Sequence, residues 1–129
     1  MELSARVARG GTTVLVETVV LGLLGPLSGR HRSPWRVTYD DLPVLAADLD
    51  VGPGAAAGWD GPAVSGGARV LVTALLVGPD LPVGLLVEGA QVLSLAGPGL
   101  LLTWVGSDTV EAAAVVTAFL AGVLAPAPA

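Results

Sequence analysis

The sequence predicts one α+β domain over residues 1–125, in which an antiparallel sheet packs against a short central helix and a long C-terminal helix. Three observations support this fold class. Apolar and polar residues alternate in short N-terminal segments, apolar runs separated by turn residues fill 68–105, and an alanine-rich segment follows them. A chain of 129 residues is long enough for one sizeable core. Residues 126–129, an Ala/Pro tail, are expected to be extended.

Residues 2–19 predict an N-terminal β-hairpin. Gly10 and Gly11 can adopt the positive φ angles that a two-residue hairpin turn requires. Pairing outward from this turn gives one apolar face, which would join Val7 with Val14 and Ala5 with Val16. On the other face Arg6 would lie diagonally across from Glu17, close enough to interact.

Two further elements are expected before residue 50. In 34–39, Trp35, Val37 and Tyr39 alternate with polar residues, which predicts a strand with one solvated face. In 41–49, apolar residues recur at helical spacing, so that a short helix is predicted, with Asp40 or Asp41 as its cap. The residues of that helical pattern are Leu42, Leu45, Ala46 and Leu49.

Residues 51–67 predict a long loop, because glycine, proline and alanine surround one Trp59-Asp60-Gly61 turn. A loop of this length is usually either functional or mobile. Four apolar runs follow and predict an antiparallel meander: 68–77, 83–87, 91–95 and 100–105. The run 68–77 is apolar on both faces, which is typical of a central strand covered on both sides.

The last element is a long helix that begins near Asp108, because Glu111 three residues later completes a pattern similar to a capping box. This helix has little polar surface, which favours a subunit or partner interface, although alanine also tolerates exposure. Two helices cover about one face of a sheet of up to seven strands. Either closure into a partly closed barrel or a second copy of the chain would have to cover the other face.

Composition excludes several classes of function. The net charge of −5 and the absence of lysine argue against nucleic-acid binding. Without cysteine, and with a single histidine, neither a disulfide nor a Cys- or His-rich metal site is available, and no cofactor is expected. The N-terminus lacks the order of a signal peptide, and the two uncharged runs are too short or too interrupted to cross a membrane, so a cytoplasmic location is expected. The missing lysine, isoleucine and asparagine indicate a GC-rich bacterium.

Polar and aromatic residues gather in 29–41 and on the glycine-rich loop. The arginines there could hold an anion between their guanidinium groups, or could form solvated salt bridges with Asp40 and Asp41. His31 could act as a general base, but no second catalytic group stands at a fixed spacing from it. Trp59 is either a binding hot spot or an anchor that folds back onto the core. The candidate binding residues are Arg30, His31, Arg32, Trp35, Arg36, Trp59 and Asp60.

No motif is tied to one chemistry, so the function has to be inferred from architecture. The favoured hypothesis is a non-enzymatic protein that acts through protein–protein contact, as a homo-oligomeric structural or assembly subunit or as a partner-binding subunit. The alternative is a small enzyme or a binder of an anionic ligand. Its pocket would be lined by Arg30, His31, Arg36, Tyr39 and Asp40.

Overall fold

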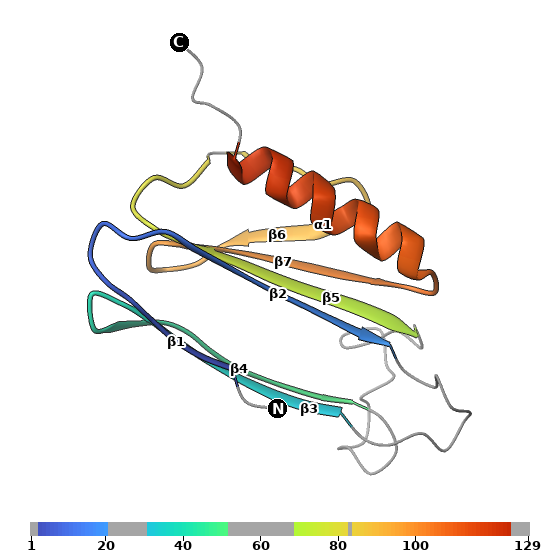
Figure 1. The fold of residues 1–129 in the computed structure, drawn as a ribbon, viewed down its shortest axis with the longest axis horizontal. Helices are drawn as coiled ribbons and strands as arrows, with labels where there is room; N and C mark the ends of the chain where they lie inside the picture. Colours follow the sequence, from blue (N-terminus) through green and yellow to red (C-terminus); the bar gives the residue numbers. More distant parts are fainter. Residues whose placement is uncertain (1–2, 21–30, 52–68, 83, 125–129) are drawn as a thin grey trace.

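The computed structural model describes residues 3–20, 31–51, 69–82 and 84–124, which form two β-sheets packed face to face with one helix on the outside (Figure 1). A three-stranded sheet has the order β1-β3-β4, and a four-stranded sheet has the order β2-β5-β7-β6. The elements are β1 (Leu3–Val7), β2 (Thr13–Val20), β3 (His31–Tyr39), β4 (Leu42–Val51), β5 (Val70–Val77), β6 (Gln91–Ser94), β7 (Gly99–Gly106) and α1 (Thr109–Leu124). The prediction of an α+β fold with a C-terminal helix is confirmed, and the partly closed barrel is not formed.

The predicted N-terminal hairpin is wrong, because β1 and β2 belong to different sheets. β1 pairs in parallel with β3, and β2 pairs antiparallel with β5. The turn between them does contain a positive φ, 84° at Gly10, but it carries the chain from one sheet to the other. Along β2 both faces are rich in apolar residues, and β5 is nearly fully buried, so pairing these two strands buries more apolar surface than the local hairpin would.

The predicted helix over 41–49 is also wrong, because these residues form β4, which is antiparallel to β3. Asp40 and Asp41 have φ angles of 50° and 63°, and they form the two-residue turn of a β3–β4 hairpin rather than a helix cap. Pro43 lies near the start of β4, an edge strand, where the missing N–H is tolerated, and the pairing register shifts beside it. The strand predicted over 34–39 is confirmed and extends to His31–Tyr39.

β5 is the central strand, as predicted from its two apolar faces. One face packs in a core with α1 and β7, in which Phe119 and Leu102 are fully buried. The opposite face, with Leu75 and Val77, packs against Trp35 and other residues of the three-stranded sheet. The second face of β5 is therefore covered by a second sheet of the same chain, and neither a barrel nor a second copy is required.

The predicted meander is correct only in part. β6 and β7 are adjacent and antiparallel, but β7 also lies beside β5, and β6 is the edge strand. Residues 84–87 contain no strand, although they do contribute to the core: Val87 is buried, and Leu85 lies so close to Gly122 of α1 that a side chain there would collide with it.

α1 begins where the sequence predicts. The backbone N–H of Val110 donates to Asp108 Oδ1 at 2.7 Å, so Asp108 caps the helix. Ala112, Val115 and Phe119 are buried against the four-stranded sheet. The exposed side of α1 is mostly alanine and threonine, which explains how a helix with little polar surface lies on the outside of the fold.

The predicted loop 51–67, apart from Val51 at the end of β4, and the predicted tail 126–129 lie outside the described residues. Among the residues that are described, no helix is both long and apolar enough to span a bilayer.

Candidate functional site

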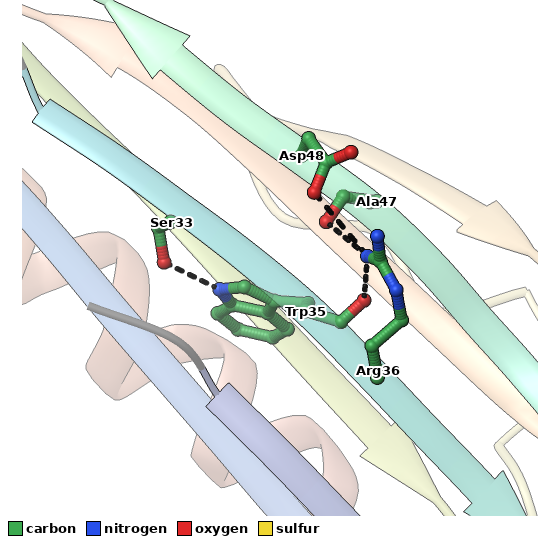
Figure 2. A network of polar contacts seen from close by, with 5 residues as sticks. All are labelled: Ser33, Trp35, Arg36, Ala47 and Asp48. Atoms are coloured by element: carbon green, nitrogen blue, oxygen red, sulfur yellow. Dashed lines mark hydrogen bonds and ion pairs between the residues drawn. The ribbon is translucent and has the colours of Figure 1, made fainter.

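β3 carries four of the seven candidate binding residues, His31, Arg32, Trp35 and Arg36. Alternation along the strand sends Trp35 to one face of the three-stranded sheet and the two arginines to the other. Trp35 points inward and is buried, whereas Arg32 and Arg36 are exposed. The Arg36 Nη1 donates to the backbone oxygens of Trp35 at 2.8 Å and Ala47 at 3.2 Å, and it lies 3.3 Å from Asp48 Oδ1. Figure 2 shows the Trp35 ring and the Arg36 guanidinium leaving the strand in different directions. Arg36 therefore ties β3 to β4 on the outer face.

The described residues do not assemble the pocket that was predicted for an enzyme or an anion-binding protein. Arg36 lies on the outer face, whereas Tyr39 is partly buried among the inward-facing residues and its hydroxyl accepts from the Gly10 N–H at 2.8 Å. Asp40 is in the exposed β3–β4 turn, at the opposite end of β3 from His31. Of the other candidates, Arg30, Trp59 and Asp60 lie outside the described residues.

A groove lies between the two sheets beside these residues. It has a volume of about 180 Å³ and mostly apolar walls. Residues from both sheets line it: Glu17, Ser33, Trp35, Leu45, Ala47, Asp48, Thr73, Leu101 and Thr103. Its walls can accommodate an apolar or extended group, with a few polar atoms to orient it.

A buried hydrogen-bond network at this groove connects the two sheets. Ser33 is fully buried, and its hydroxyl donates to Glu17 Oε2 at 2.6 Å while it accepts from Trp35 Nε1 at 3.1 Å. Ser33 is on β3 and Glu17 is on β2, so this network fixes the two sheets relative to each other. This network was not predicted from the sequence, although a signal exists: Ser33 and Glu17 are each polar on a strand face that is otherwise largely apolar.

A second hollow, of about 290 Å³, lies beside the β3–β4 turn, and both charged and apolar residues line it. Arg6 lies 3.2 Å from Asp41 there, and both side chains are more than 80% exposed. The hairpin pairing that would place Arg6 diagonally across from Glu17 is therefore wrong: β1 and β2 are not paired, the Arg6 side chain is 85% exposed, and the Glu17 carboxylate accepts from Ser33 instead. An ion pair this exposed contributes little to stability. Elsewhere too, the described residues contain no group of three His, Cys, Asp or Glu side chains that could hold a metal ion.

One side of the sandwich is open, because three strands lie over four. β4 packs over the start of β7. Val44 approaches Gly99 so closely that any side chain at position 99 would collide with Val44. β6 is the strand beyond β7. On this side Leu93 is 51% exposed and Val105 is 45% exposed, whereas Leu102, which faces α1 from the same part of the sheet, is fully buried. We refer to the surface of Gln91, Leu93, Thr103 and Val105 as the open face.

Comparisons with known proteins give one consistent result. The sequence model of the UreD urease accessory protein family matches residues 1–127. The chain is 37% identical over 113 residues to the urease accessory protein UreD of Streptomyces coelicolor, and equally so to UreD 3 of Streptomyces griseus. It is 33% identical over 126 residues to UreD of Frankia casuarinae. These alignments cover 84%, 84% and 74% of this chain but only 44%, 44% and 39% of the relatives, so the chain spans less than half of their length.

Proposed function

Because the chain belongs to the UreD urease accessory protein family, we propose that it acts as a non-catalytic binding module that contacts urease polypeptides. The match of the family to 127 of the 129 residues carries this proposal. The relatives are named for an accessory role to urease, and such a role is exerted through contact with another protein. Sequence motifs assigned no function to the chain, and family membership now provides one. The prediction of a structural subunit is wrong, because the family is one of accessory proteins.

The structure supports a binding role more than a catalytic one. The described part of β3 does not gather Arg36, Tyr39 and Asp40 into a pocket, so the alternative of a small enzyme or anion binder gains no support from their geometry. The surface instead offers the open face, in which Leu93 and Val105 are about half exposed beside Gln91 and Thr103, and the exposed Arg32 and Arg36 on the three-stranded sheet. Aromatic or apolar anchors with a charged rim are the usual composition of protein interfaces.

We place Arg32 and Arg36 at the rim of this contact and the open face nearer its centre. Rim charges mainly affect the association rate and its dependence on salt, and central apolar residues carry most of the affinity. The remaining candidates from the sequence, Arg30, His31, Trp59 and Asp60, stay proposed as binding residues, without a place in this contact. Trp35 contributes by packing, since it is only 3% exposed.

The partner in this proposal is another protein rather than a second copy of the chain. A homo-oligomer was predicted because one face of the sheet had no cover, and the three-stranded sheet provides that cover. The remaining open face is smaller than a whole sheet face.

A binding titration tests the proposal. The chain is immobilised on a surface, and urease polypeptides that were produced without accessory proteins are added at increasing concentration. Saturable one-to-one binding is expected, weakened by salt because rim charges take part. Arg36→Ala should mainly slow association, while Arg9→Ala, in the exposed turn between β1 and β2 and outside the open face, serves as the control. Absence of saturable binding at tens of micromolar would refute the proposed function.

A further inference from the structure

The Arg36 guanidinium is held on the outer face of the three-stranded sheet through one nitrogen. Its Nη1 donates to the backbone oxygens of Trp35 at 2.8 Å and Ala47 at 3.2 Å, and Asp48 Oδ1 lies 3.3 Å away. Three acceptors compete for the two hydrogens of Nη1, so the longest contact, with Asp48, is the weakest. The two backbone carbonyls therefore fix the position of the guanidinium, and Asp48 adds mainly its charge.

The opposite edge of this guanidinium carries N–H groups that the sheet does not use. Within the described residues nothing accepts from Nε or Nη2 of Arg36, and the dashed lines that reach Arg36 in Figure 2 all end on one terminal nitrogen. The Nε–H and one Nη2–H of an arginine are parallel, which is the geometry that holds both oxygens of a carboxylate. The Arg36 side chain is 49% exposed, so a partner can reach this edge.

The neighbours of Arg36 on the side of β1 are not acidic. Ser4 lies opposite Arg36 in the register of β1 and β3, and the next outward residue of β1 is Arg6, which forms an exposed ion pair with Asp41. Asp48, the acid that contacts Arg36, lies on the other side, on β4. Both side chains of this pair are about half exposed, and water screens such a pair, so Asp48 offsets the charge of Arg36 only in part.

Resting on the proposed function, we propose that Arg36 recognises one Asp or Glu side chain of the urease partner, with Nε and Nη2 donating to the two carboxylate oxygens. The partner is a protein, and these side chains are the planar two-oxygen anions that a protein surface offers. The guanidinium is held in place before binding, so little side-chain entropy is lost when the contact forms. A role limited to joining β3 to β4 would use Nη1 alone.

The binding kinetics of Arg36→Lys separate this contact from simple charge attraction. Lysine keeps the positive charge but lacks the parallel pair of N–H groups. Association with urease polypeptides should therefore change by less than about twofold, while dissociation becomes about fivefold faster or more. The matched control is Arg9→Lys, because Arg9 is exposed in the turn between β1 and β2; both of its rates should stay within about twofold.

Replacing Asp48 by asparagine separates recognition from a structural role. Arg36 keeps its two carbonyl acceptors and loses a competing negative charge, so the complex should dissociate about twofold more slowly or better. Asp80→Asn, which changes the net charge equally at an exposed position, is the control and should leave dissociation unchanged. Faster dissociation of Asp48→Asn, together with a lower urea midpoint, would mean that the pair only joins β3 to β4, and the inference would be wrong.

Substitutions in the partner identify the carboxylate. Exposed Asp and Glu residues of the urease polypeptides are replaced one at a time by Asn or Gln. One replacement should speed dissociation from the unmodified chain but have no further effect with Arg36→Lys, since both changes remove the same contact. If no acidic residue is coupled in this way, or if Arg36→Lys dissociates as slowly as the unmodified chain, carboxylate recognition is refuted while the proposed function stands. Failure of the unmodified chain to bind refutes both.

Discussion

Replacing Ser33 by alanine tests how the two sheets are held together. The Ser33 hydroxyl is fully buried and makes two hydrogen bonds, one to the Glu17 carboxylate at 2.6 Å and one from the Trp35 indole at 3.1 Å. A hydrogen bond to a charged group contributes about 1.5–3 kcal/mol to stability and a neutral one about 1 kcal/mol. Ser33→Ala removes both and should lower the free energy of unfolding by about 2–4 kcal/mol.

Urea unfolding followed by tryptophan fluorescence measures this change, with the slope against urea expected to stay the same. The matched control is Ser94→Ala, because Ser94 is exposed on a strand and its replacement should change stability by less than about 0.5 kcal/mol. A double-mutant cycle with Glu17→Gln isolates the bond between the sheets. If Ser33→Ala costs no more than Ser94→Ala, then β2 and β3 do not face each other as described, and the sandwich is refuted.

Three further substitutions probe other elements, each by the same urea titration. Phe119→Ala should destabilise by about 3–5 kcal/mol, because the side chain is fully buried between α1 and the four-stranded sheet; a cost similar to that of the exposed Thr117→Ala would contradict the packing of α1. Asp108→Ala should cost about 1 kcal/mol through loss of the helix cap, and no loss would mean that the cap does not form. Asp40→Gly should stabilise by about 1 kcal/mol, because glycine adopts the φ of 50° without steric cost, whereas destabilisation would argue against the two-residue turn.

The elements that the sequence predicts correctly are those whose pattern has one solution. β5 is apolar on both faces and too short for a buried helix, so it had to be a central strand. α1 has a cap, a long alanine-rich run and no internal proline, so both its type and its start were predictable.

The N-terminal and central elements were mispredicted because local patterns are compatible with two structures. Gly10 and Gly11 suit a hairpin turn, but they also suit an arch between sheets, and only long-range pairing with β3 and β5 decides between them. Helical spacing is compatible with Leu42, Leu45 and Leu49. The two preceding aspartates have positive φ angles, however, and form a hairpin turn, so that the residues after them continue as a strand. The competing interactions lie far away in the sequence, where local propensity has no information.

The candidate site was only partly predictable for the same reason. Trp35 and Arg36 were identified from 29–41, but which of them is buried depends on the sheet that packs against β3. The open face depends on the strand order, since it exists only because β6 lies beyond β7. The prediction of self-association followed from the missing cover of the sheet, and it lost its basis once the arch supplied a second sheet.

The mass of the chain alone in solution tests most directly whether its own elements cover both faces of β5. Light scattering on the complete chain at tens of micromolar should give one species at the mass of a single chain, 12.8 kDa. That mass should not change with dilution, because no self-association is needed to bury the core. A stable species at twice that mass would contradict the account, which assigns the second face of β5 to the chain's own three-stranded sheet and the open face to a different protein.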